Sequence, residues 1–291
     1  MVSYLCNRFH ISVAELSLMK LALAIQTPEV PRLVPVALLS GTLEEKLAKA
    51  ALWGADGVEL MTSHPAQVDP DSMQTLLGQY GLQIAAVASG AISLALGYTL
   101  LNVDPEISQK ARARLYELID LAAALHAPLV TIGSFRGKLV WVGEGARDQL
   151  VEILRQAGVY AQARSVRIAL EALNRYEGDI VNNHVEGLAF LEEVSHPALG
   201  LLLDTYHVNI EESSWTEPFQ RVLQAGKLFH VHLGDNNRLP PGKGLIDFPA
   251  IVAALRRGGY DGFLTAELLA RPDPDTAARE TLTYMRSLLG N

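Results

Sequence analysis

The feature that most constrains the fold is a series of eight short apolar segments, separated by polar turns and helical patterns. They lie at residues 20–25, 57–61, 83–88, 128–133, 166–172, 200–205, 228–233 and 263–268. Most are apolar throughout rather than alternating, which is typical of parallel strands that are covered on both faces. Eight strand–helix units in about 270 residues predict an α/β fold, a (β/α)8 TIM barrel.

Local signals between these segments support the same arrangement. Residues 42–45 (TLEE) form a capping box before a helical pattern, and Asp104-Pro105 opens a second run with apolar residues at steps of three and four. The sequences at 54–57 (GADG) and 259–262 (GYDG) repeat one helix-to-strand corner. An open doubly wound sheet would carry a phosphate-binding glycine turn after its first strand, and none follows residues 19–25. The barrel is therefore favoured.

Composition narrows the partners and the location. The formal net charge is -8, which disfavours nucleic acids because their binding proteins carry a basic surface. The single cysteine, Cys6, excludes an internal disulfide and fits a reducing cytoplasm. No apolar run is long enough for a bilayer, and residues 1–18 lack the basic start and apolar core of a signal peptide. We predict a cytoplasmic protein with residues 1–18 as an extension outside the fold and 19–291 as one barrel domain.

Polar side chains stand at the carboxyl ends of the last four predicted strands. They are Glu171, Asp204, His230 with His232, and Glu267. The carboxyl ends of barrel strands form the active face, so we expect these groups to converge there. Burying any one of these charges alone is costly, whereas a divalent cation satisfies all of them together. Carboxylate oxygens with one imidazole suit Mn²⁺, Mg²⁺ or Co²⁺ better than a structural zinc site.

Alternation along the strand does not decide between the two histidines, because His230 and His232 point to the same side. His232 lies nearer the carboxyl end, so we predict it as the ligand and His230 as a deeper hydrogen-bonding residue. Each residue also has an ordinary interpretation as a cap, an ion-pair member or a packed histidine, and Glu177 could simply pair with Arg175. Four successive strands with the same anomaly at the same end favour a site.

The motifs resemble those of a known enzyme family. Four segments carry the resemblance: EALNRYE (171–177), LDTYHVNIEE (203–212), HVHLGDNNRLPPGKG (230–244) and TAEL (265–268). They are similar to the D-tagatose/D-psicose 3-epimerases of the xylose isomerase-like TIM barrels. The segments at 89–108 and 19–25 look most like the 5-keto-L-gluconate epimerase branch.

The resemblance implies an isomerase that epimerises a ketose or keto-uronic acid at C3 through a cis-enediolate. It implies one divalent ion, Mn²⁺ first with Mg²⁺ or Co²⁺ as alternatives, held by Glu171, Asp204, His232 and Glu267. Glu171 and Glu267 would exchange the proton on opposite faces of the sugar. Substrate contacts are implied for Glu177, His207 and Arg238, with His207 expected to leave its strand and reach over the rim. Relatives of this kind form dimers or tetramers, so we expect a homo-oligomer.

Three alternatives use the same scaffold. An aldose–ketose isomerase of the hydroxypyruvate isomerase kind shares the enediolate chemistry. A metal-dependent apurinic endonuclease would need a basic groove, against which the acidic balance of this chain argues. A barrel that binds sugar without catalysis would have no use for a pair of carboxylates such as Glu171 and Glu267.

Overall fold

The computed structural model describes residues 19–290, and its eight parallel strands close into a barrel in which each strand pairs with the next and β8 pairs with β1. The strands are β1 (Lys20–Gln26), β2 (Gly57–Met61), β3 (Gln83–Ala88), β4 (Leu129–Ile132), β5 (Arg167–Glu171), β6 (Leu199–Asp204), β7 (Leu228–Leu233) and β8 (Phe263–Ala266). The predicted (β/α)8 barrel is confirmed. The predicted extension, residues 1–18, lies outside the described residues.

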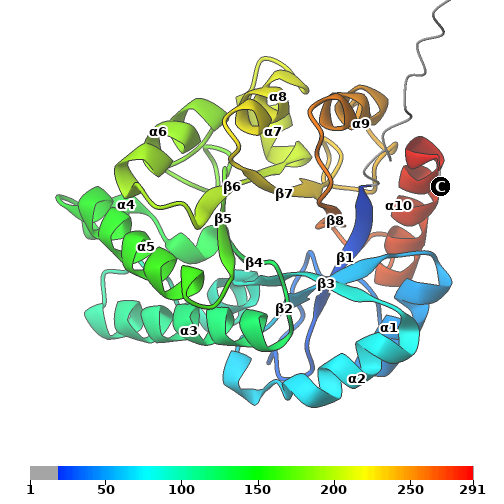
Figure 1. Ribbon diagram of the computed structural model, residues 1–291, viewed down its shortest axis with the longest axis horizontal. Coiled ribbons are helices and arrows are strands. Elements are labelled where there is room, and N and C mark those ends of the chain that lie inside the picture. Colours follow the sequence, from blue (N-terminus) through cyan, green and yellow to red (C-terminus); the bar gives the residue numbers. More distant parts are fainter. Residues whose placement is uncertain (1–18, 291) are drawn as a thin grey trace, which may run out of the picture.

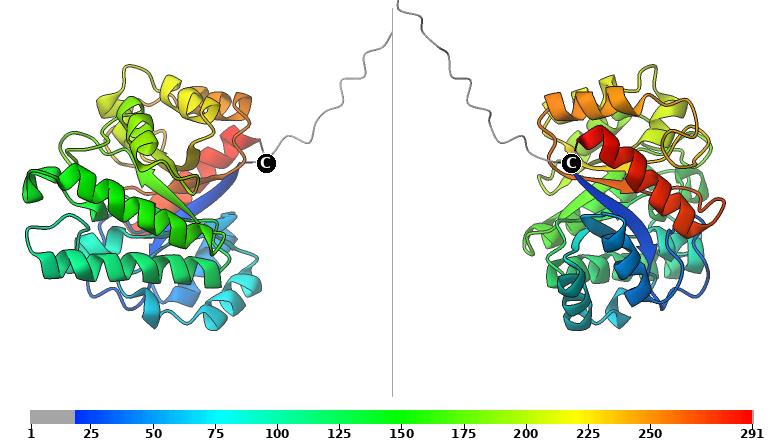
Figure 2. Two further views of the ribbon diagram at one scale, coloured as in Figure 1. Left: turned by 60° about the vertical axis from the view of Figure 1, so that its left-hand side comes forward. Right: turned by 90° about the vertical axis from the view of Figure 1, so that its right-hand side faces the viewer.

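Helices surround the strands in chain order, so the colours of Figure 1 run once around the ring. They are α1 (Leu43–Leu52), α2 (Pro70–Tyr80), α3 (Pro105–Ala124), α4 (Leu139–Val142), α5 (Ala146–Gln162), α6 (His184–Val194), α7 (Thr205–Glu211), α8 (Glu217–Gln224), α9 (Phe248–Arg257) and α10 (Pro274–Leu289). The side views of Figure 2 show the helices on the outside of the strands, with α10 next to β1 where the ring closes.

The helix signals of the sequence are confirmed as local geometry. Thr42 caps α1, since its hydroxyl accepts from the Glu45 amide at 3.3 Å while the Glu45 carboxylate accepts from the Thr42 amide at 2.8 Å. Asp104 caps α3 in the same role. The two repeated corners have left-handed glycines at φ +85° for Gly54 and +73° for Gly259, as a helix end followed by a strand requires.

Alternation along the strands divides the core into an outer and an inner part. The outward side chains pack against the helices in one large apolar cluster. Smaller apolar groups fill the barrel itself, and one of them contains Ala86, Leu129, Ala169 and Leu202. The carboxyl half of the interior is polar instead, which places titratable groups inside a rigid wall of strands.

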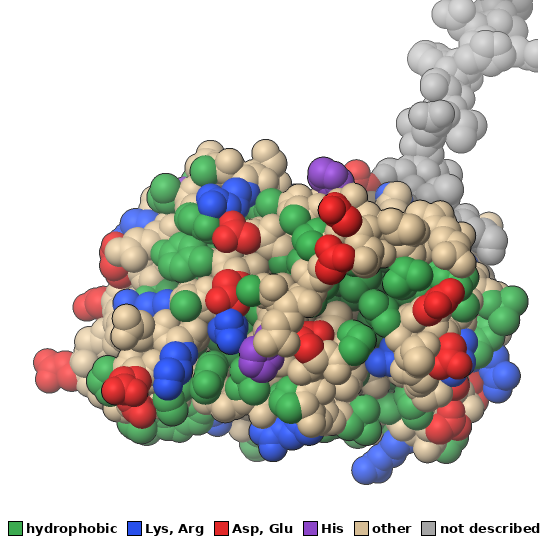
Figure 3. Space-filling model, turned by 90° about the horizontal axis from the view of Figure 1, so that it is seen from below, with side chains coloured by type: hydrophobic (Ala, Val, Ile, Leu, Met, Phe, Trp, Pro, Cys, Tyr) green, Lys and Arg blue, Asp and Glu red, His purple; other side chains and the backbone are tan. Residues whose placement is uncertain are grey.

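Figure 3 shows the charged side chains on one face of the surface. Acidic and basic side chains are interspersed over the described part of that face, without a continuous basic area. Among residues 19–290, no helix combines the length and apolar character needed to cross a membrane.

Candidate metal centre

Four predicted residues meet at the carboxyl end of the barrel, and we call them the mouth cluster: Glu171, Asp204, His232 and Glu267. One ligand atom from each lies within 4.8 Å of those of the other three, and all four residues are buried. Glu171 and Asp204 end β5 and β6, and His232 lies in β7. The prediction that the eighth strand includes Glu267 was wrong, because β8 ends at Ala266 and Glu267 begins the loop that leaves the barrel.

The mouth cluster holds buried polar atoms that the described protein does not satisfy. Glu171 Oε1, Asp204 Oδ2 and His232 Nδ1 have no hydrogen-bond partner among residues 19–290. The His232 Nδ1 atom lies 3.5 Å from Glu267 Oε2 and 3.9 Å from Glu171 Oε1, which is far for a hydrogen bond but ordinary for two ligands of one ion. Buried acceptors without a hydrogen-bond partner are rare and destabilising, so these ligand atoms fit a divalent cation.

The electrostatics of the mouth cluster support the same conclusion. Burial raises the pKa of Glu171 well above its usual value, and the nearby Glu267 carboxylate raises it further. Burial also raises the pKa of Asp204 to about 6. For Glu267 burial acts in the same direction, but the His232 imidazole and Arg238 outweigh it and hold the pKa below its usual value. The protein alone therefore does not keep all three carboxylates ionised, whereas a bound cation would.

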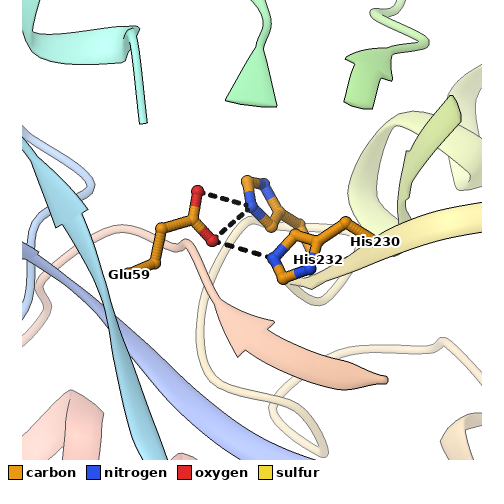
Figure 4. Close-up of side chains that lie close together, drawn as sticks. All are labelled: Glu59, His230 and His232. Atoms are coloured by element: carbon orange, nitrogen blue, oxygen red, sulfur yellow. Dashed lines mark hydrogen bonds and ion pairs between the residues drawn. The ribbon is translucent and has the colours of Figure 1, made fainter. Parts of the chain in front are cut away.

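His232 is held from its other side by a carboxylate that the sequence interpretation missed. Glu59, from β2, crosses the barrel interior to His230 and His232 of β7, as Figure 4 shows. We call Glu59, His230 and His232 the interior cluster. Glu59 Oε2 lies 2.8 Å from His230 Nε2 and 3.1 Å from His232 Nε2. The prediction that His230 is the deeper, hydrogen-bonding histidine agrees with this geometry.

The interior cluster is buried, and both oxygens of its carboxylate, Glu59, are paired. Glu59 has no exposed surface, and Thr131 donates to its Oε1 at 3.0 Å. Thr265 Oγ1 lies 3.0 Å from His230 Nε2. Although burial alone would raise the pKa of Glu59, the two imidazoles lower it well below its usual value. Glu59 is thus an ionised carboxylate inside the barrel.

His207 lies inside the site rather than over its rim, which corrects the prediction. It sits on α7, directly after Asp204, and is 1% exposed. Its Nδ1 accepts from the backbone N–H of Asn174 at 3.3 Å and lies 2.7 Å from the Asn174 side-chain nitrogen. Burial lowers the pKa of His207 well below its usual value, so the ring is neutral and its proton is on Nε2. That N–H lies 3.5 Å from Glu171 Oε1 and has no hydrogen-bond partner among the described residues.

Arg238 and Glu177 form an ion pair beside the mouth cluster. Arg238 Nη1 lies 3.2 Å from Glu177 Oε1, and Nη2 lies 3.5 Å from Glu267 Oε2. The ordinary interpretation that Glu177 pairs with Arg175 was wrong, because Arg175 pairs with Glu211 at 2.8 Å.

The loop that carries Arg238 is built around Asp235. This carboxylate is completely buried and accepts from the backbone N–H groups of Gly242, Gly244 and Ile246. Arg238 itself adopts φ +58°, a left-handed conformation that the loop must support. The guanidinium is therefore carried by a loop whose backbone is bound to a buried carboxylate.

Glu171 is supported from behind by two further residues. Arg136 is completely buried, and its guanidinium donates to the backbone carbonyls of Glu171 at 2.6 Å and Ile180 at 2.8 Å. Burial lowers the pKa of Arg136 to about 10, which still leaves it charged. Gly133 lies against the Glu171 carboxylate, and a Cβ at that position would collide with it. The carboxylate thus occupies space that only a glycine leaves open.

A cavity of about 200 Å³ opens onto these groups. Its charged wall contains Glu171, Glu177, His232, Arg238 and Glu267. Its other lining residues from the first half of the barrel are small, polar or apolar and carry no charge: Pro35, Val36, Ala88, Ser89, Gly90, Leu94, Thr131, Gly133 and Ser134. A polar molecule of the size of a sugar therefore meets charged side chains only from the second half of the barrel.

Comparison with known proteins identifies the family. The sequence model described as "Xylose isomerase-like TIM barrel" matches residues 47–288. An L-ribulose 3-epimerase of Methylomonas sp. (strain DH-1) is 33% identical over 249 residues, which cover 83% of this chain and 84% of the relative. A ketose 3-epimerase of Arthrobacter globiformis is 31% identical over 212 residues, covering 72% and 71%. The chain belongs to the ketose 3-epimerase family of xylose isomerase-like TIM barrels.

A solved structure from the same family has the same fold. The D-allulose 3-epimerase from Methylomonas sp. in complex with D-allulose aligns with a TM-score of 0.74 and 26% identity, covering 93% of this chain and 97% of that one. The sequence therefore led to the right family.

Sequence reasoning found every member of the mouth cluster and missed only Glu59 of the interior cluster. The members of the mouth cluster lie at strand ends, whereas Glu59 stands in the middle of the apolar segment GVELM. A lone carboxylate inside an otherwise apolar strand was the signal, because such a charge requires a buried partner.

Proposed function

We propose that this chain epimerises a ketose or keto-uronic acid at C3 with one divalent ion held by the mouth cluster. The observation that carries the proposal is the set of three buried ligand atoms in that cluster that have no partner among residues 19–290. Glu171, His232 and Glu267 of the cluster line a cavity of sugar size together with Arg238. Three carboxylates and one imidazole favour Mn²⁺ first, with Mg²⁺ or Co²⁺ as alternatives. When bound, the ion supplies a Lewis acid that stabilises negative charge developing on the substrate oxygens.

Glu171 and Glu267 are the proposed catalytic pair. Epimerisation at C3 requires one group to remove the proton next to the C2 carbonyl and another to return a proton to the opposite face of the planar enediolate. Both carboxylates border the same cavity, one from β5 and one from the residue after β8, so they approach a bound sugar from different strands. Which of the two takes the proton depends on the direction of the reaction.

His207, Arg238 and Glu177 are the proposed substrate contacts. His207 Nε2–H, which has no partner in the described part of the chain, lies beside Glu171, where it can donate to the sugar oxygen at C1 or C2. Arg238 presents a fixed pair of N–H groups whose direction Glu177 sets. These groups bind and orient the reacting end of the sugar.

We place the distal end of the sugar against the uncharged residues that line the cavity. Among the described residues that line the cavity, Arg238 is the single lysine or arginine, and it is already paired with Glu177 and Glu267. This supports a substrate without a phosphate group, since no second cation is available to bind one. The finer proposal that the chain belongs with the 5-keto-L-gluconate epimerases rests on its segments at 89–108 and 19–25. A carboxylate on such a substrate would have to reach Arg238.

A panel of free ketohexoses, ketopentoses and keto-uronic acids in D₂O tests the proposal. We expect deuterium at C3 of one neutral ketose or keto-uronic acid, with formation of its C3 epimer. Deuterium uptake at C1 with an aldose product would instead support an aldose–ketose isomerase, and binding without exchange would support a sugar-binding barrel. A homo-oligomeric state and a cytoplasmic location stay part of the proposal, with light scattering as the measure of the first.

A further inference from the structure

The carboxylate of Glu59 stands on the far side of His232 from the mouth cluster and does not line the cavity. The geometry points to a positioning role: we propose that Glu59, steadied by His230 and Thr131, fixes the tautomer and the ring orientation in which His232 can ligate a metal. The inference rests on the proposed metal centre and adds residues of the interior cluster to it.

The proton of the His232 ring lies on the nitrogen that faces Glu59. An ionised carboxylate only accepts hydrogen bonds, so a ring nitrogen that contacts it must carry a proton. His232 Nε2 lies 3.1 Å from Oε2 and 3.3 Å from Oε1 of Glu59. An imidazole that ligates an ion is neutral and has one N–H, so with that proton on Nε2 the Nδ1 lone pair is free for the ion. Nδ1 is the atom that faces Glu171 and Glu267.

Glu59 is itself held too firmly to turn away. His230 Nε2 donates to its Oε2 at 2.8 Å, and the Thr131 hydroxyl donates to its Oε1 at 3.0 Å. The His230 and His232 rings meet edge to face, with centroids 5.1 Å apart. Strands β2, β4 and β7 therefore fix one carboxylate between them. A ligand histidine that is supported in this way loses little freedom when an ion binds.

The interior cluster could instead be a second metal site, since it also combines a carboxylate with two imidazoles. Its contacts argue against that reading. The contacts of Glu59 Oε2, at 2.8 and 3.1 Å, have ordinary hydrogen-bond lengths. Three ligand atoms of the mouth cluster are buried and have no hydrogen-bond partner among the described residues. No side-chain atom of Glu59 or His230 is in that condition.

The test is calorimetric titration of Mn²⁺ into metal-stripped wild type and Glu59→Gln. Glutamine has the shape of glutamate, but its amide NH₂ would face an imidazole N–H and force one ring into another tautomer. We expect one ion per chain in both proteins, and a Kd about 10- to 100-fold weaker in Glu59→Gln. Thr265→Val is the matched control, because it removes a hydroxyl beside His230 and leaves the Glu59–His232 contact intact. We expect its Kd within about threefold of wild type.

A second measurement stays informative if Glu59→Gln does not fold. In ¹⁵N-histidine-labelled, Mg²⁺-loaded wild type, we expect His232 to keep a slowly exchanging proton on Nε2. A proton on Nδ1 would overturn the inference.

Three titration outcomes would also overturn it: an unchanged Kd in Glu59→Gln, an equal loss in Thr265→Val, or a fall from two ions to one in Glu59→Gln. If wild type itself bound no Mn²⁺, the proposed metal centre would fail, and the two failures are therefore distinguishable.

Discussion

The mouth cluster and the interior cluster share His232, combine carboxylates with imidazoles and are both buried, yet their carboxylate oxygens differ in whether they have hydrogen-bond partners. In the interior cluster every negative oxygen of Glu59 receives an N–H or O–H, from His230, His232 and Thr131. In the mouth cluster three ligand atoms have no partner among the residues that the structure describes. Burial alone therefore does not mark a functional group.

What distinguishes the two is whether the protein completes its own hydrogen bonds. A completed network stabilises the barrel, and its removal would leave buried donors unpaired. An incomplete network is destabilising until a ligand completes it, which is the usual condition of a binding site.

The largest effect that would sharpen this contrast is expected for Glu171→Gln. The amide cannot take up a proton, so kcat should fall at least about 10³-fold, equivalent to roughly 4 kcal/mol. The metal-free variant should be at least as stable as metal-free wild type, because the substitution removes one of three neighbouring buried carboxyls. Steady-state kinetics and thermal unfolding with EDTA measure the two effects.

Glu193→Gln makes the same chemical change at an exposed ion pair with Arg147 and serves as the control. Its kcat should equal that of wild type. Near-normal turnover by Glu171→Gln would show that Glu171 is not one of the acid–base pair. A marked loss of stability in the metal-free variant would contradict the contrast between the two clusters.

The fold and the mouth cluster were predictable because each strand can be recognised from its own local sequence. Apolar segments such as 199–204 give the strand, and the barrel rule brings the residues at their carboxyl ends together. The position of Asp204 in space thus follows from its place in the sequence.

The interior cluster was not predictable in this way, because its contacts join strands on different sides of the ring. Glu59 of β2 and His230 of β7 are 171 positions apart and do not lie on neighbouring strands. His207 was misplaced for a related reason. Its direction depends on α7 beginning at once after Asp204 and on Asn174 from another loop, and neither is visible in the spacing of the motif.

A smaller effect is expected from removing the metal. An ion present at about 100 times its Kd stabilises the folded state by about 2.7 kcal/mol, which raises Tm by roughly 5 °C or more in a chain of this size. Differential scanning calorimetry of stripped wild type with and without Mn²⁺ measures the shift. In Asp204→Asn most of it should be lost, because that side chain supplies one of the unpartnered ligand atoms. An equal shift in Asp204→Asn would place the ion elsewhere.

The smallest effect is expected for Arg238→Lys, at the edge of the mouth cluster. Its guanidinium contacts Glu177 and Glu267 with two different nitrogens, and a lysine ammonium cannot span both. We expect KM to rise about tenfold, or roughly 1.4 kcal/mol, while the Mn²⁺ affinity stays within a few-fold of wild type.

Arg175→Lys is the matched control for Arg238→Lys, since Arg175 also grips a carboxylate with two nitrogens but does not line the cavity. Its KM should be unchanged. If Arg238→Lys instead weakened Mn²⁺ binding with KM unaltered, the charge of Arg238 would orient the ligand Glu267 and would not bind the sugar. Arg238 would then act as part of the protein's own hydrogen-bond network, as the residues around Glu59 do.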